Sequence, residues 1–309
     1  MKNKIIVSIF PTYLCNNNCE FCYLNNHHGE SILDLNTLKQ RLKQISQYFE
    51  IEKFNLYGGE ITLLPNTYLK ELNDILIQYK CKNYLTTNFY DISKLHIFKN
   101  TFFSTSLNEE RPDYDYIKSI LKKGVNLENL TVLSIVSPSL IRKTPKDALD
   151  GYNGLNIQWV SFVKYYPSIN TGDVYKITQD QYENFLINIL TYYTSHEKDF
   201  DYKLCLENGL KSCLNRTYPI ATNDQCIRIS PDGKFGAVYY TNDNLEYFKW
   251  YDDVESYIAD AKKERMEYIK RCGNCKYYGN CWTEHLTKIK CDGCKNLLKV
   301  AEDIENERW

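Results

Sequence analysis

The chain has 309 residues, and its 38 lysines and arginines against 39 aspartates and glutamates give a formal net charge of −1. This balance disfavours a protein that wraps a nucleic-acid backbone. The hydrophobic fraction of 43% is typical of a globular protein with a full core, and no apolar run approaches the roughly 20 residues of a membrane span. The N-terminus has no signal-peptide cleavage site, so we expect a cytoplasmic protein without nucleic-acid or membrane partners.

Short apolar segments alternate with amphipathic segments from residue 4 to about residue 200. The predicted strands are residues 4–10, 53–56, 83–87, 101–107, 130–136 and 157–163. The predicted helices are 35–49, 68–79 and 178–194, with Asp34 or Asn36 and Asn66 or Thr67 as N-caps of the first two. Strands separated by helices pair in parallel. The pattern therefore predicts an α/β fold, a partial (β/α)6 TIM-like barrel.

After about residue 200 the pattern changes. Residues 226–240 carry Pro-Asp-Gly between two alternating segments, which predicts a β-hairpin. A polar helix is predicted over residues 252–270, and it leads into a group of cysteines. We therefore expect a small C-terminal hairpin-plus-helix domain.

The twelve cysteines are the unusual feature of the composition, and eight of them form two groups. The first group is Cys15, Cys19 and Cys22, a CxxxCxxC motif directly after the first predicted strand. The second group is Cys272, Cys275, Cys281, Cys291 and Cys294. In a chain without a secretion signal, cysteines at such spacing indicate metal ligation rather than disulfides.

Three thiolates on one short loop can bind a single iron–sulfur cube. Cubane clusters usually have four cysteine ligands, so a set of three implies one iron that is open to a substrate or cofactor. The alternatives are three unconnected thiols or a zinc site, for which His27 or His28 would complete the tetrahedron.

The CxxxCxxC motif resembles the signature of radical S-adenosylmethionine (SAM) enzymes. Gly58-Gly59-Glu60, after the second predicted strand, resembles the Gly-Gly-Glu motif of that family. The resemblance implies a 4Fe–4S cluster on the three cysteines and SAM bound to its open iron. It also implies reductive cleavage of SAM to a 5′-deoxyadenosyl radical, which abstracts hydrogen from a C–H bond.

Other residues match positions at which the family contacts SAM. Thr87-Asn88 resembles the family's Thr-Asn-Gly, with Phe89 in place of the glycine. The residues that the resemblance places at SAM are Phe21, Gly58, Gly59, Glu60, Asn88, Ser106 and Asn108. Read without the resemblance, Phe21, Asn88, Ser106 and Asn108 are ordinary packed or strand-end residues.

The second cysteine group resembles the SPASM extension of radical SAM peptide-modifying enzymes, which holds two auxiliary clusters. Cys226 and Gly233 match its opening, but Val238 and His285 stand where two ligands of the first auxiliary cluster are expected. The resemblance therefore implies one auxiliary cluster, held by Cys272, Cys275, Cys281 and either Cys291 or Cys294. A zinc knuckle has equally suitable spacing. The implied domains are a barrel over 1–205 and an auxiliary-cluster domain over 206–309.

A SPASM-type extension implies a peptide substrate, most often a ribosomally made precursor that is crosslinked, epimerised or oxidised. The implied partners are an electron donor such as flavodoxin or ferredoxin and a separate leader-recognition protein, since the chain starts at its first strand. Cys226 is a candidate hydrogen-atom donor, and Cys205 and Cys213 are further candidates. The alternatives are an enzyme acting on a small molecule or on another protein, and a zinc-binding interaction protein.

Overall fold

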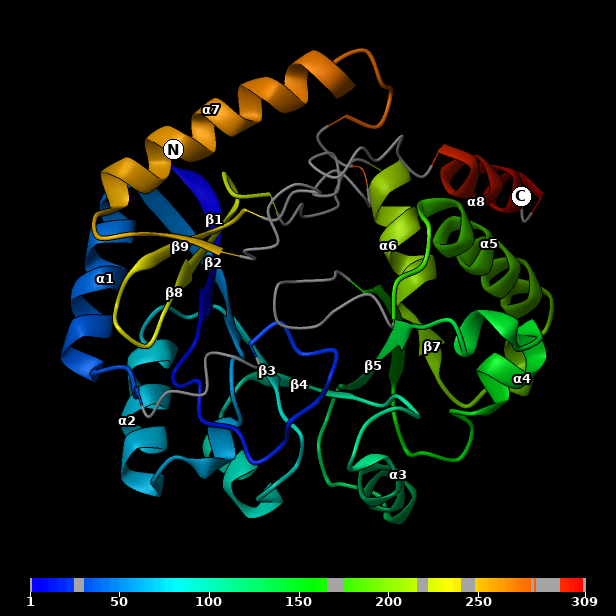
Figure 1. The fold of residues 1–309 in the computed structure, drawn as a ribbon, viewed down its shortest axis with the longest axis horizontal. Coiled ribbons are helices and arrows are strands. Elements are labelled where there is room, and N and C mark those ends of the chain that lie inside the picture. The colour runs from blue at the N-terminus through cyan, green and yellow to red at the C-terminus, as the bar shows by residue number, and fades with distance from the viewer. Residues whose placement is uncertain are drawn as a thin grey trace.

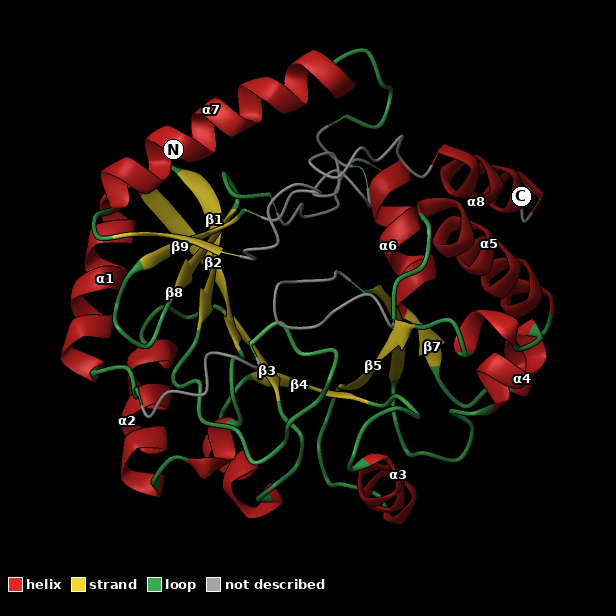
Figure 2. Ribbon diagram, viewed as in Figure 1, coloured by secondary structure: helices red, strands yellow, loops and turns green. Residues whose placement is uncertain are grey.

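The computed structural model describes residues 2–24, 31–165, 175–215, 222–239, 248–278, 281 and 295–307. Within these residues ten strands form one sheet in the order β10-β9-β8-β1-β2-β3-β4-β5-β6-β7. The sheet is curved, and most helices lie on its outer side (Figure 1; Figure 2). This arrangement confirms the predicted α/β fold of the partial-barrel type.

The parallel part of the sheet is the partial barrel. Its strands are β1 (Asn3–Ile9), β2 (Phe49–Leu56), β3 (Lys82–Thr86), β4 (Thr101–Ser106), β5 (Leu130–Val136), β6 (Trp159–Lys164) and β7 (Lys203–Leu204). The connecting helices are α1 (Leu35–Tyr48), α2 (Asn66–Ile77), α3 (Tyr114–Lys123), α4 (Pro145–Asp150) and α5 (Gln179–Ser195). Short 3-10 helices add η2 (Ile61–Leu63), η3 (Ile92–Ile97), η4 (Leu140–Arg142) and η5 (Glu197–Asp199). The six predicted strands are confirmed, and β7 follows them.

The starts of the helices show which sequence signals act. Asp34 is the N-cap of α1, and its carboxylate accepts a hydrogen bond from the Thr37 N–H at 2.7 Å. Thr178 and Gln181 form a capping box at the start of α5. The predicted cap of α2 at Asn66 or Thr67 is wrong, because the N-cap is Pro65. The ring of Pro65 holds φ at −60° with an extended ψ, so that the helix begins at the next residue.

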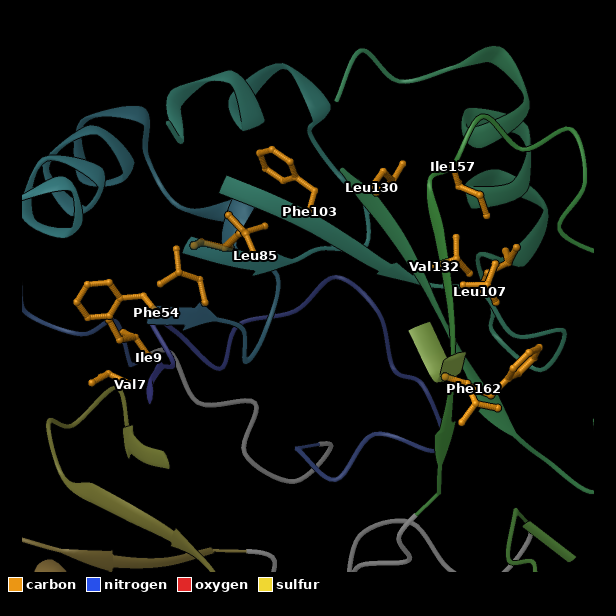
Figure 3. Close-up of a cluster of buried hydrophobic side chains, with 14 of the residues drawn as sticks. Val7, Ile9, Phe54, Leu85, Phe103, Leu107, Leu130, Val132, Ile157 and Phe162 are labelled. Atoms are coloured by element: carbon orange, nitrogen blue, oxygen red, sulfur yellow. The ribbon is translucent and has the colours of Figure 1, made fainter. Parts of the chain in front are cut away.

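The core lies between the sheet and the outer helices. On β5, Leu130, Val132 and Val136 are buried on this side, whereas Leu133 and Ile135 lie on the opposite face and line a cavity inside the barrel. Figure 3 shows ten labelled side chains of this layer, from Val7 on β1 to Phe162 on β6. The outer face is thus filled, while the inner face carries the residues available for a ligand.

The C-terminal part extends the same sheet. It comprises α6 (Cys205–Leu214), β8 (Cys226–Ile229), β9 (Phe235–Val238), β10 (Phe248–Tyr251), α7 (Val254–Cys272) and α8 (Lys295–Glu307). The predicted hairpin and polar helix are confirmed as β8–β9 and α7. β8 pairs in parallel with β1, so the sheet continues across the predicted boundary at residue 205. Among the described residues, no helix combines the length and apolar character of a membrane span.

Candidate active site

A cavity of about 350 Å³ lies at the carboxyl ends of the parallel strands, the edge at which α/β folds bind their ligands. Nine predicted site residues line it: Cys15, Cys19, Phe21, Cys22, Gly58, Gly59, Glu60, Asn88 and Ser106. The fold therefore brings together residues that follow four different strands.

Asn108 and Cys226 are predicted site residues that do not line this cavity. Asn108 lines a neighbouring cavity of about 40 Å³, and its Oδ1 accepts a hydrogen bond from the Ile135 N–H at 2.6 Å. Cys226 is buried on β8, where its Sγ lies 3.5 Å from the Ser8 hydroxyl oxygen. The SAM contact of Asn108 and the hydrogen-atom transfer by Cys226 stay predictions.

The Gly-Gly-Glu segment joins the end of β2 to the chain that leads into the cysteine loop. The Gly59 N–H donates to the Thr12 carbonyl at 2.9 Å, and the Glu60 N–H donates to the Leu14 carbonyl at 2.7 Å. A Cβ on Gly59 would lie 1.9 Å from the Leu14 oxygen, and Gly58 has a φ of +135°. Glycine is therefore required here because two backbone segments touch.

The Glu60 carboxylate is buried and holds three segments together. Its Oε1 accepts hydrogen bonds from the Thr62 N–H at 2.9 Å and from the Thr87 hydroxyl at 2.8 Å. Its Oε2 accepts one from the Asn88 N–H at 2.6 Å. Through these three hydrogen bonds Glu60 fixes the end of β3 relative to the end of β2.

The asparagines between Cys15 and Cys19 attach the cysteine loop to the barrel. Asn88 Nδ2 donates to Asn16 Oδ1 at 2.8 Å, and Asn17 Nδ2 donates to Asp113 Oδ2 at 2.5 Å. Inside the loop, the Cys22 N–H donates to the Cys19 carbonyl at 2.9 Å. Directly after Cys15 the loop is thus tied to Asn88, which follows β3, and to Asp113, the N-cap of α3.

Arg111 is a site residue that the sequence analysis missed. It is 8% exposed, lines the cavity, and forms two hydrogen bonds to Asp113, from Nε at 2.7 Å and from a terminal nitrogen at 2.8 Å. Burial raises the pKa of the Cys15 and Cys19 thiols, and the positive charge of Arg111 opposes this rise. No sequence motif surrounds Arg111, and only its position five residues after β4 could have indicated a ligand contact.

Asp113 connects Arg111 to the cysteine loop, so a substitution of Asp113 tests this connection. Burial opposes its ionisation, but the hydrogen bonds and charge of Arg111 outweigh burial and hold the pKa of Asp113 below its usual value. Because the folded-state pKa is lowered, the ion pair stabilises the protein at neutral pH and this stabilisation is lost as the pH falls below about 4.

We therefore expect Asp113→Asn to weaken iron retention at the N-terminal loop by about 10–100-fold, the range for losing an outer partner of a metal ligand. Competition with an iron chelator measures this. The exposed neighbour Asp115 is the matched control, and Asp115→Asn should leave retention unchanged. Equal retention in Asp113→Asn and the parent protein would contradict the role assigned to this clamp.

Burial disfavours the charged form of all three thiols in the cysteine loop. It raises the pKa of Cys15, that of Cys19 to about 12 and that of Cys22 to about 11, so a thiolate here would be favoured by a positive partner. Among the described residues no three His, Cys, Asp or Glu side chains form a group that could hold a single metal ion.

Phe89, which replaces the glycine of Thr-Asn-Gly, adopts a backbone conformation that is typical of glycine. It has a φ of +61°, in the left-handed region that favours glycine, and it is fully buried. Its N–H donates to the Thr87 hydroxyl at 3.0 Å, and its carbonyl accepts from the Tyr116 hydroxyl at 3.1 Å. The chain therefore retains the glycine-like turn, at a conformational cost of about 1–2 kcal/mol.

The second cysteine group is described in part. The Cys275 N–H donates to the Cys272 carbonyl at 2.8 Å, so these two cysteines flank a tight turn after α7. Cys281 is half-buried and packs against the main core together with Cys275. The remaining residues named for metal binding, His27, His28, His285, Cys291 and Cys294, lie outside the described residues.

Val238 stands where the SPASM resemblance implies a cysteine, and the structure shows which residues surround it on the hairpin. The register of β8 and β9, in which Arg228 pairs with Gly236, places Cys226 opposite Val238. The Val238 N–H donates to Asn223 Oδ1 at 2.8 Å, and Asn223 Nδ2 donates to the Val238 carbonyl at 2.9 Å. An asparagine thus secures the strand beside this cysteine–valine pair.

The other two candidate cysteines lie on α6. Cys213 is buried in the main core. Cys205, at the start of the helix, is half-buried, and burial raises the pKa of its thiol to about 11. Neither Cys205 nor Cys213 lines the 350 Å³ cavity.

Comparison with known proteins shows what this chain is similar to. Residues 9–146 match the Radical SAM superfamily. The fold is similar to that of anSMEcpe with bound AdoMet, with a TM-score of 0.69, 17% identity and coverage of 98% of this chain and 97% of that one. It is also similar to Streptococcus suis SuiB bound to S-adenosylmethionine, with a TM-score of 0.59, 14% identity and coverage of 95% and 76%.

A third similar structure is S. suis SuiB bound to the precursor peptide SuiA, with a TM-score of 0.60, 16% identity and coverage of 96% of this chain and 75% of that one. At these identities the likeness shows a shared fold. Curated proteins give no match. CxxxCxxC and Gly-Gly-Glu, the two motifs that line the cavity, both lie within residues 9–146, the part of the chain that is similar to the radical SAM superfamily.

Proposed function

We propose that this enzyme abstracts a hydrogen atom from a C–H bond of a peptide substrate. The observation that carries the proposal is the single cavity that combines the CxxxCxxC thiols with the Gly-Gly-Glu segment in a chain that is similar to the radical SAM superfamily. A peptide is favoured because the fold resembles SuiB bound to precursor peptide SuiA and anSMEcpe with bound AdoMet and the Cp18Cys peptide. These likenesses cover 96% and 99% of the chain.

Cys15, Cys19 and Cys22 hold the 4Fe–4S cluster in this proposal. When bound, cluster and SAM together supply a 5′-deoxyadenosyl radical, after an electron has arrived from a flavodoxin- or ferredoxin-type donor. The chain's own contribution is placement and the exclusion of water. Glu60 and Asn88 fix the wall beside the loop, and Phe21 and Ser106 line the cavity where they would contact SAM. Apolar side chains also line the cavity: Leu133, Ile135 and Val163.

We assign the second cysteine group to one auxiliary cluster, with Cys272, Cys275 and Cys281 as ligands and Cys291 or Cys294 as the fourth. The turn between Cys272 and Cys275 and the packing of both Cys275 and Cys281 against the main core support this assignment. The group belongs to the proposed auxiliary-cluster domain of residues 206–309.

The first experiment is anaerobic reconstitution followed by incubation with dithionite and SAM. We expect release of 5′-deoxyadenosine and iron and sulfide in amounts that exceed one cluster per chain. Stoichiometric zinc without 5′-deoxyadenosine would contradict the proposal and favour a zinc-binding interaction protein.

The second experiment identifies the reaction. The enzyme is co-expressed with a short precursor encoded beside its gene, and the peptide is weighed by mass spectrometry. Loss of two hydrogens per event indicates crosslinking or oxidation, whereas unchanged mass with deuterium uptake from heavy water indicates epimerisation. An unmodified peptide together with active SAM cleavage would favour a small molecule or another protein as substrate.

A further inference from the structure

A buried carboxylate on the barrel reaches the start of the C-terminal helix. Glu183, on α5, is 6% exposed, and its Oε1 accepts a hydrogen bond from the Leu297 N–H at 3.0 Å. Its Oε2 accepts a weaker one from Asn296 Nδ2 at 3.5 Å. The first turn of α8 contains no acidic residue of its own. Glu183 therefore supplies from another helix the acceptor and negative charge that a helix N-terminus requires.

α8 is attached to the barrel by apolar contacts as well. Leu297, Leu298 and Ala301 are buried in the main core, and the helix packs on α5 and α6, as Figure 1 shows at the C-terminal end of the chain. Apolar packing alone is sufficient to dock a helix, and burying a carboxylate is costly. The position of Glu183 at the first turn therefore indicates that Glu183 holds the start of α8 at one place on the barrel.

The same helix is attached to the first half of the second cysteine group. Glu302 on α8 accepts hydrogen bonds from Lys276 Nζ at 2.6 Å and 2.8 Å and from the Tyr277 hydroxyl at 2.5 Å. Lys276 and Tyr277 directly follow Cys275 in the sequence. α8 thus links the Cys272–Cys275 turn, through Glu302, to the barrel helix that carries Glu183.

We propose that Glu183 is a positioning residue for the auxiliary cluster. By capping α8 it fixes that helix on the barrel, and Glu302 then holds the Cys272–Cys275 turn against the fixed helix. The inference rests on the auxiliary cluster of the proposed function. It adds that the cluster keeps a defined place relative to the barrel only while the cap is present.

The test uses the full chain with Cys15, Cys19 and Cys22 replaced by alanine, so that only C-terminal iron remains. Glu183→Ala and Glu183→Gln are compared in this background, with the exposed Asp180→Asn on the same helix as the matched control. Hydrogen exchange reports on α8. Iron release to a chelator and the electron paramagnetic resonance spectrum of the reduced protein report on the cluster.

We expect Glu183→Ala to accelerate exchange of the Leu297 amide on the order of tenfold, the effect of losing a helix cap. Iron release should accelerate several-fold and the spectrum should broaden. Glu183→Gln should restore most of the protection because its amide oxygen still accepts from the Leu297 N–H. In the chain with all cysteines, SAM cleavage without peptide should be unchanged by Glu183→Ala.

Three results would overturn parts of this account, and they are distinguishable. Unchanged exchange in Glu183→Ala would show that the cap does not hold α8. Faster exchange with parental iron release and spectrum would show that α8 does not position the cluster. If the parent protein binds no iron after reconstitution, the auxiliary cluster itself is wrong, and with it the positioning role.

Discussion

Replacing Gly59 with alanine is expected to abolish SAM cleavage and to lower the free energy of unfolding by more than about 3 kcal/mol, above the usual cost of overpacking a core. The added Cβ would lie 1.9 Å from the Leu14 oxygen and 2.7 Å from the Tyr13 carbonyl carbon. Both neighbours are backbone atoms, so no side-chain rotation can relieve the overlap. The chain leading to Cys15 must move away from β2, and the cysteine loop moves with it.

Gly151→Ala is the matched control for this substitution. Gly151 has an ordinary backbone conformation, and a Cβ there would meet its nearest atoms at 3.7 Å and 3.9 Å. We expect little change in either property. Thermal unfolding and 5′-deoxyadenosine release measure the two effects, and a Gly59→Ala protein with parental activity would refute the close approach described here.

Replacing Cys15, Cys19 or Cys22 with alanine is expected to remove the iron of the N-terminal cluster and to reduce 5′-deoxyadenosine formation by more than about 100-fold, beyond the effect of losing an outer partner. The reason is that each thiol is proposed as a direct ligand. Burial raises the pKa of Cys19 to about 12, and binding to iron would favour the thiolate form of this side chain.

Cys81→Ala is the control for the cysteine series. Cys81 is half-buried just before β3, at the opposite end of that strand from Asn88, and is not among the cavity-lining residues. Iron content, sulfide content and product formation should match those of the parent protein. Parental iron in the Cys15, Cys19 and Cys22 variants would contradict the ligand assignment.

Much of the barrel follows from local patterns in the sequence. On β5, side chains that alternate between core and cavity produce the period of two that predicts a strand. Asp34 and Thr178 cap their helices through contacts within three residues. By contrast, β7 and β10 are too short to produce a pattern, and the position of α8 depends on α5 and α6.

The candidate site likewise contains some residues that local motifs indicate and others that only long-range contacts bring together. CxxxCxxC and Gly-Gly-Glu can be recognised in the sequence because the residues within each motif lie close together along the chain. Arg111 and Asn17 are joined through Asp113, which lies 96 residues after Asn17, and no local signal in the sequence records such a contact. Asn108 also follows β4, and its side chain accepts a hydrogen bond from the Ile135 N–H, a contact that no local pattern in the sequence records.

The pairing of β1 with β8 has a consequence for how the protein assembles. Ile6 lies beside Cys226, and the Ser8–Cys226 contact joins residues 218 positions apart. Contacts of such separation slow folding because a long chain must be ordered before they form. During synthesis the first strand therefore keeps one edge open until residue 229 has emerged. A chain released after α5 would expose that edge to aggregation, so completion of the barrel depends on its last third.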